Sequence, residues 1–367
     1  MSESQLRRMD SRPVGAARGE VRACLIVRNE SLRLPALLDH HRQIGVDRFF
    51  IVDNASDDGT LDLLLAESDV HVFWTDAPFR TDKAHWRRAV MEEFFSEGWG
   101  LHVDADELFV YPHMEQIDLH RFCSFLDEEG VAGIFASMVD MYGQRPLDSD
   151  PYRAGDPLTE HYPFFDRGGY QLRFRGRRQR DRVSPPFQLV GGARARVFFA
   201  HRAGVISRAL ARRFYDVGHT TPHPATRIPG LGARLNSLAR RALPAYLPSC
   251  GKVPLLRSDV GLASQTRCLE ALHELEPAIP LSHCWASLLH FKYMPNLREH
   301  VTEASETNRY GTSAGAEYQR YAEVLRETDE LVLYGPHSAR FESTADLLES
   351  GLMRRTEELT AFSAKGS

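Results

Sequence analysis

The sequence predicts an α/β fold in which a largely parallel sheet is covered by helices. Three observations predict it. Short apolar runs rich in strand-forming residues recur between residues 21 and 107, leucines at helical spacing lie between these runs, and a polar loop follows most of them. Alternating strands and helices of this kind are typical of a parallel sheet with helices on its faces.

Four strands and three helices are expected in this region. The strands are predicted at Val21–Val27, 48–52, Val70–Trp74 and 99–103. The helices are predicted around 34–41, where Pro35 suits the first turn, around 61–65, and over 86–95.

The rest of the chain is less regular. Residues 131–139 predict another strand, residues 1–20 lack periodicity and predict a disordered tail, and residues 297–367 predict a mainly helical C-terminal extension. The sheet with its flanking helices is therefore expected to end in a helical addition.

Composition excludes several classes of protein. A net charge of −5 argues against a general nucleic-acid binder, and no apolar run is long enough to predict a membrane span or a signal peptide. Five widely spaced cysteines without a Cys-x-x-Cys pair predict a reduced compartment rather than a disulfide or zinc framework. We expect a cytoplasmic protein, and peripheral attachment to the inner face of a membrane is left open.

Polar clusters follow three of the predicted parallel strands. Arg28, Asn29 and Glu30 follow the first, Asp53 and its neighbours follow the second, and an acidic cluster of residues 104–107 follows the fourth. Ligands of such sheets bind beyond the carboxyl ends of the strands, so these clusters are expected to meet in one crevice.

The sharpest motif is the pair Asp104 and Asp106, which is separated by one residue and followed by Glu107. Paired carboxylates in a loop bind a hard divalent cation between themselves and a diphosphate. The alternative is a solvated acidic turn. The apolar strand that precedes the pair favours a metal site.

The segment from Asp53 to Thr60 is rich in Asn, Asp, Ser and Gly, which predicts a tight turn and a helix cap. Asp53 also ends its strand, where its carboxylate can accept a hydrogen bond from a nucleobase N–H. A carboxylate does not suit phosphate, so a metal at Asp104 and Asp106 is expected to neutralise the diphosphate.

These motifs resemble the family 2-like glycosyltransferases of the GT-A fold. The resemblance rests on Ile26 to Glu30, on residues 52–60 and on residues 99–107. Residues 191–198, 252–255 and 289–293 resemble more narrowly the branch related to family 92 galactosyltransferase-like proteins. The resemblance covers residues 21–325.

The resemblance implies a GT-A fold with a Rossmann-like mixed sheet, and it implies a glycosyltransferase activity. The activity is transfer of a sugar from a nucleoside-diphosphate sugar, UDP-linked, to a hydroxyl of a glycan or glycolipid, with inversion and with Mn²⁺ or Mg²⁺. Residues 21–140 would be the half that binds the nucleotide sugar, and 141–296 the half that binds the acceptor.

The resemblance also implies roles for individual residues. The metal would be held by Asp104, Asp106 and His290, and Asp53 would contact the base. The diphosphate would be clamped by Lys292 with Arg194 or Arg196. The same nucleotide pocket would include Arg28, Asn29, Glu30, Asn54, Asp58, Lys83 and Trp86.

An inverting transfer also needs a carboxylate that deprotonates the acceptor. Asp140, Asp166, Asp216 and Glu160 lie in the acceptor half, and Asp166 is the prediction made here because it precedes an arginine-rich segment. One departure from the family is Arg267, at a position where relatives carry a histidine.

The sequence leaves alternatives open for the arginine-rich segment and for the function. Residues 167–182 contain seven arginines and one acid, which suits a solvated loop, a site for an anionic glycan, a lipid-binding patch or an alternating strand. A catalytically degenerate GT-A protein that binds a partner through these arginines is the main alternative. A phosphotransferase of the haloacid dehalogenase type is disfavoured by Leu108 after the acidic motif.

Overall fold

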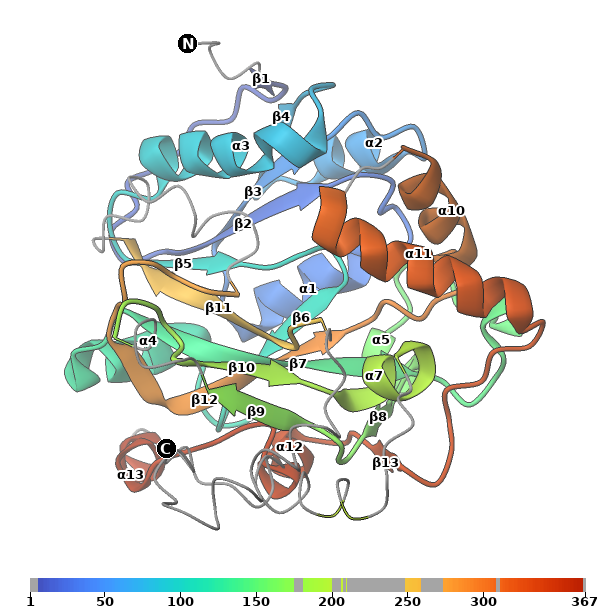
Figure 1. Cartoon of the computed structure of the whole chain (residues 1–367). Helices are drawn as coiled ribbons and strands as arrows, with labels where there is room; N and C mark the ends of the chain where they lie inside the picture. Colours follow the sequence, from blue (N-terminus) through green and yellow to red (C-terminus); the bar gives the residue numbers. More distant parts are fainter. Residues whose placement is uncertain are drawn as a thin grey trace.

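A mixed β-sheet runs through the centre of the molecule, with helices on both sides (Figure 1). The protein is represented by a computed structural model, which describes residues 6–174, 181–199, 206, 209, 248–258, 273–307 and 311–365. The predicted α/β, Rossmann-like architecture with a mainly helical C-terminal extension is confirmed.

The main sheet has the strand order β1-β4-β3-β2-β5-β11-β7-β12-β6, and β8 and β13 continue it beside β7. A separate two-stranded sheet pairs β9 with β10. The strands are β1 (Arg7–Arg8), β2 (Val21–Val27), β3 (Arg48–Asp53), β4 (Val70–Trp74), β5 (Trp99–His102), β6 (Glu107–Val110), β7 (Gly133–Tyr142), β8 (Phe164–Asp166), β9 (Gln171–Phe174), β10 (Phe187–Val190), β11 (Gly251–Arg257), β12 (Leu281–His290) and β13 (Ser338–Arg340).

Helices connect the parallel strands and close the C-terminal part of the chain. They are α1 (Leu34–Ile44), α2 (Thr60–Ala66), α3 (Phe79–Phe94), α4 (Leu119–Glu129), α5 (Leu158–His161), α7 (Gly192–Phe198), α10 (Leu297–Thr307), α11 (Gly311–Glu327), α12 (Thr344–Ser350) and α13 (Glu357–Ala364), with a short 3₁₀ helix at Leu147–Ser149.

Both faces of the parallel strands are buried, which explains why these strands are apolar throughout. In β3, Phe49 and Ile51 face the core that contains α1 and α4, whereas Phe50 and Val52 face α3. Burial of each such side chain contributes about 1.5–3 kcal/mol. Parallel sheets need this double cover because helical crossovers lie on their faces.

Strand direction determines where the functional side chains meet. Strands β2, β3, β4 and β5 are parallel, and β11 runs against both β5 and β7, so that β7 and its parallel neighbour β12 point the same way as the first four. The carboxyl ends of β2, β3, β5, β7 and β12 therefore lie along one edge of the sheet.

The C-terminal helices form two pairs. Helices α10 and α11 contact one another and share an apolar cluster with α7 at the end of β12. Helices α12 and α13 lie on the lower side of the sheet in Figure 1 and add Leu347 and Leu359 to the main core. The first pair places residues of α11 beside the carboxyl ends of the strands.

Two elements extend beyond their predicted limits, and the arginine-rich segment contains a strand, which is one of the alternatives left open for it. Helix α3 begins at Phe79, because Pro78 starts it and the polar residues that follow form its exposed face. Strand β7 extends to Tyr142, which places Asp140 on the strand. In the arginine-rich segment, Leu172 and Phe174 lie on β9, whereas residues 175–180 are outside the described residues.

The N-terminal segment also differs from the predicted disordered tail. Strand β1 pairs with β4, and the Asp10 carboxylate accepts hydrogen bonds from the backbone N–H of Val72 at 2.8 Å and of Arg12 at 2.9 Å and from Arg8 at 3.0 Å. Burial alone would raise the pKa of Asp10, but these hydrogen bonds outweigh it and lower the pKa to about 2. A two-residue strand is too short to give a periodic pattern.

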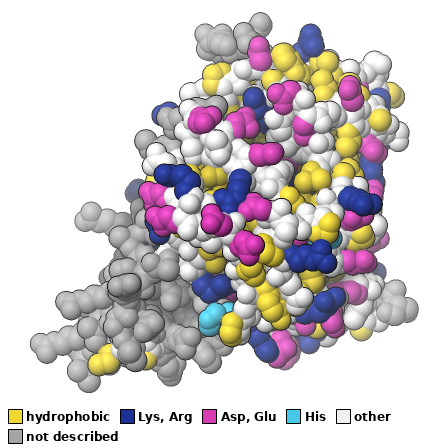
Figure 2. Space-filling view, turned by 90° about the vertical axis from the view of Figure 1, so that its right-hand side faces the viewer, with side chains coloured by type: hydrophobic (Ala, Val, Ile, Leu, Met, Phe, Trp, Pro, Cys, Tyr) yellow, Lys and Arg dark blue, Asp and Glu magenta, His cyan; other side chains and the backbone are white. Residues whose placement is uncertain are grey.

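Cys24, Cys123, Cys250 and Cys284 are buried and free, as the spacing of the cysteines predicted. Basic and acidic side chains lie side by side on the face drawn in Figure 2. Within the described part of the chain, no helix has the length and apolar character needed to cross a membrane.

Replacing Asp10 by Asn tests the docking of the N-terminal segment. Loss of the charge-assisted hydrogen bonds is expected to lower the free energy of unfolding by about 1–3 kcal/mol. Because the pKa of Asp10 is lowered to about 2, the stabilisation is present above pH 4 and is lost as the pH falls toward 2. Urea denaturation of both proteins between pH 2 and 7 measures the difference; a difference independent of pH would contradict this account.

Candidate functional site

A pocket of about 440 Å³ opens at the carboxyl ends of the parallel strands. Ligand sites of α/β sheets occur at this edge. Many of the predicted site residues line this pocket: Arg28, Glu30, Lys83, Asp104, Asp106, Arg194, His290 and Lys292.

The acidic motif forms a closed turn between β5 and β6. The backbone N–H of Asp104 donates to Oε2 of Glu107 at 3.0 Å, and the backbone N–H of Glu107 donates to the carbonyl of Asp104 at 3.1 Å. The side chain of Asp104 is 53% exposed and that of Asp106 is 24% exposed, whereas Glu107 is buried. The turn therefore presents the first two carboxylates to the pocket.

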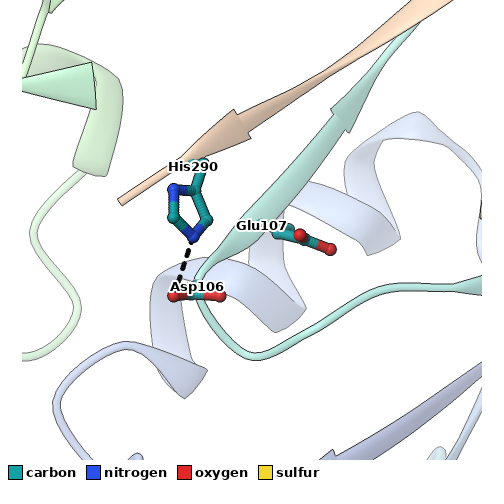
Figure 3. Close-up of side chains that lie close together, drawn as sticks. All are labelled: Asp106, Glu107 and His290. Carbon is teal, nitrogen blue, oxygen red and sulfur yellow. Dashed lines mark ion pairs between the residues drawn. The ribbon is translucent and has the colours of Figure 1, made fainter. Parts of the chain in front are cut away.

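His290 ends β12 and lies between two carboxylates. Its Nε2 is 3.2 Å from Oδ2 of Asp106 (Figure 3), and its Nδ1 is 2.8 Å from Oδ1 of Asp140. Burial alone would lower the pKa of His290, but Asp106 and Asp140 outweigh it and raise the pKa. This position therefore favours positive charge.

Asp140 and Arg194 form a buried ion pair behind His290. Arg194, on α7, donates its backbone N–H to Asp140 at 3.1 Å and its guanidinium to Asp140 at 2.9 Å, and it lies 3.6 Å from Glu317 on α11. Burial alone would raise the pKa of Asp140, but Arg194 and His290 lower it strongly. Asp140 thus stays ionised and orients both side chains.

Lys252, on β11, lies between two members of the acidic motif. Its ammonium contacts Oδ2 of Asp104 and donates to Oε1 of Glu107 at 2.5 Å, and its side chain is only 5% exposed. Arg87, on α3, lies 4.0 Å from the other oxygen of Asp104. The acidic motif is therefore partly neutralised by cations of the protein itself.

A divalent ion fits part of this site. Asp106, Glu107 and His290 offer ligand atoms within 4.8 Å of one another, and oxygen and imidazole nitrogen suit Mn²⁺. In the view of Figure 3, Asp106 and His290 point toward each other and the Glu107 carboxylate points away from them. Asp106 and His290 thus face each other most directly, at 3.2 Å between Oδ2 and Nε2.

The lining of the pocket also combines cations with apolar side chains. Ile26 and Phe79 line it, and the ammonium of Lys83 lies 5.2 Å from the centre of the Phe79 ring. Arg28 pairs with Glu303 at 3.1 Å. Glu30 pairs with Arg33 at 2.8 Å, and burial raises its pKa to about 7 despite that arginine.

Four predicted nucleotide residues serve the loop structure and do not line the pocket. Asn29 accepts from the backbone of Asp57, Asn54 donates to two backbone carbonyls, and Asp58 accepts from Ser31 and Thr60. Asp53 is fully buried and accepts from the backbone N–H of Ser56 at 3.1 Å. Its Oδ1 has no hydrogen-bond partner among the described residues.

Asp166, the predicted base, is not brought to the pocket. Both of its oxygens accept from Arg196 at 2.8 Å, and Tyr142 donates to it at 2.5 Å. Glu160 and Trp86 do not line the pocket either, and Trp86 is buried in the core beside α3. Asp216 and Arg267 lie outside the described residues.

Sequence reasoning missed several pocket residues: Arg33, Arg87, Lys252, His273 and Glu317. Lys252 begins the motif 252–255, for which no individual role was predicted, and the other four lie outside the motifs. One signal was available for Lys252, because only four of the 45 basic residues are lysines and three of these, Lys83, Lys252 and Lys292, line the pocket. His273 donates from Nδ1 to the carbonyl of Gly251 at 2.6 Å, and burial lowers its pKa to about 4.

Comparison with protein-family models gives no match, and comparison with curated proteins gives none either. One solved structure that resembles the chain is a crystal structure of 4-diphosphocytidyl-2C-methyl-D-erythritol synthase, at 13% sequence identity and a TM-score of 0.24. The match covers 34% of this chain and 63% of that one. The resemblance to glycosyltransferases therefore stays a prediction.

Replacing Asp140 by Ala tests the ion pair behind His290. The change leaves Arg194 buried without its main carboxylate, so the free energy of unfolding is expected to fall by about 3–5 kcal/mol. Asp148→Ala is the matched control, because Asp148 pairs with Arg298 at the surface and such pairs contribute about 0–1 kcal/mol. Equal losses in the two variants, measured by urea denaturation, would refute a buried pair of this strength.

Proposed function

We propose that this chain is a divalent-metal-dependent glycosyltransferase of the GT-A type. It would transfer a sugar from a UDP-linked donor to a hydroxyl of a glycan or glycolipid, with inversion, in the cytoplasm. The observation that carries the proposal is the meeting of Asp106, His290 and several cations in one pocket at the carboxyl ends of the strands.

The charges of the pocket suit a diphosphate held through a metal. Asp106 and His290 would hold the ion, with Asp140 fixing the Nδ1 side of the imidazole. When bound, Mn²⁺ or Mg²⁺ supplies positive charge to the departing diphosphate. Lys292, Arg194 and Lys252 line the same wall and would stabilise the phosphate oxygens that the ion does not reach.

The nucleoside would occupy the part of the pocket that Ile26, Arg28, Phe79 and Lys83 line. Apolar side chains there suit the face of a base, and the cations suit the ribose phosphate.

The base for the acceptor hydroxyl is not assigned to Asp166. A general base needs a lone pair within reach of the reacting proton, and Arg196 and Tyr142 occupy the oxygens of Asp166 outside the pocket. The geometry instead makes Asp166 a structural partner that ties α7 to β8.

Replacing Asp106 by Asn tests the reaction. Metal-dependent release of nucleotide is measured first on a panel of nucleotide sugars without acceptor, and UDP-sugars are expected to react. Loss of a direct metal ligand is expected to reduce that release by about 100-fold or more. Asp62→Asn, on the exposed face of α2, is the control and should react like the wild type. Full activity of the Asp106→Asn variant would refute the proposal.

Replacing His290 by Ala tests the metal site without turnover. UDP and Mn²⁺ together at 100 times their dissociation constant are expected to stabilise the wild type by about 2.7 kcal/mol. In the His290→Ala variant the part of this stabilisation that needs Mn²⁺ should disappear. Thermal unfolding with UDP, with Mn²⁺ and with both measures it, and an unchanged Mn²⁺ effect would contradict a metal site at His290.

A further inference from the structure

We propose that Lys252 is a built-in cation of the donor site, which withholds Asp104 and Glu107 from the metal and binds the diphosphate directly. The inference rests on the proposed function and specifies how the site divides its positive charge. A single divalent ion would then be held by Asp106 and His290, and the second positive charge of the site would belong to the protein.

The first support is that side-chain and backbone groups of the protein already contact the carboxylates of Asp104 and Glu107. Lys252 contacts Asp104 and donates to Oε1 of Glu107 at 2.5 Å, and Oε2 of Glu107 accepts from the backbone of Asp104 at 3.0 Å. Both oxygens of Glu107 are therefore engaged. An ion that used Glu107 would have to displace a buried ammonium, and Asp104 could offer it only Oδ1, which lies 4.0 Å from Arg87.

The second support is the position of Lys252 in the fold. It lies on β11 and pairs with Ala136 of β7, and three residues further along the same strand Leu255 pairs with Leu101 of β5, the strand that leads into the acidic motif. The ammonium is thus held at the pocket wall in contact with Asp104 and Glu107.

The third support is the chemistry of lysine itself. An ammonium has three N–H donors, and the two carboxylates use two of them. Lysine is a compact point charge that suits a phosphate oxygen, whereas arginine presents a planar fork. In a chain with 41 arginines among its 45 basic residues, a lysine at this position indicates a need for the smaller cation.

A Lys252→Met variant separates this role from a structural one. Removing the ammonium frees Asp104 and Glu107, so the affinity for Mn²⁺ alone is expected to rise about tenfold, the change that 1.4 kcal/mol produces. The affinity for UDP in the presence of a chelator is expected to fall about tenfold, because the diphosphate loses its direct cation. Calorimetric titration of the full-length protein measures both.

A matched control is Lys83→Met, which removes the same charge from the same pocket at a lysine that lies 5.2 Å from the centre of the Phe79 ring. Its Mn²⁺ affinity is expected to change less than about threefold, a difference below 1 kcal/mol. An equal rise in both variants would overturn the inference, since it would reflect net charge alone. If Lys252→Met does not fold, Lys252→Gln, which retains hydrogen-bonding capacity without charge, takes its place with the same expected result.

The outcomes also separate the inference from the proposed function. An unchanged or lower Mn²⁺ affinity in the Lys252 variant, or a wild type that binds no UDP without metal, would overturn the role of Lys252. A wild type that binds no UDP even with Mn²⁺ would overturn the proposed function, while the Mn²⁺ titration would still decide whether Lys252 withholds the two carboxylates.

Discussion

The site depends on the neutralisation of four carboxylates gathered at one edge of the sheet. Asp104, Asp106, Glu107 and Asp140 lie at the ends of β5, β6 and β7, where like charges repel one another and burial disfavours ionisation. Cations from elements far apart in the sequence offset this repulsion: Lys252 from β11, Arg194 from α7 and His290 from β12. The same ion pairs tie the two halves of the chain to each other.

Apolar patterning determined what could be predicted of the fold. Strands β2 and β4 have the predicted limits, because a strand buried on both faces is an uninterrupted apolar run. The start of α3 and the pairing of β1 were missed, since an exposed helical turn and a two-residue strand leave no such pattern. Tertiary contacts such as those of Asp10 stabilise these segments.

Several residues of the candidate site could be predicted because a polar motif stands at the end of an apolar strand. Asp104, Asp106 and His290 end or follow apolar strands, and all three line the pocket. Turn residues such as Asp58 resemble ligands in the sequence but satisfy the backbone. The role of Lys252 could not be predicted from its segment 252–255, because its partners lie almost 150 residues earlier and only the sheet order brings it between them.

The central claim is that Asp106 and His290 hold a divalent ion that binds a nucleoside diphosphate in this pocket. A crystal structure of the protein with UDP and Mn²⁺, with anomalous scattering recorded for manganese, tests it most directly. One manganese peak is expected between Asp106 and His290, in contact with the diphosphate. The ammonium of Lys252 is expected to remain between Asp104 and Glu107. Manganese or UDP bound elsewhere, with this pocket empty, would contradict it.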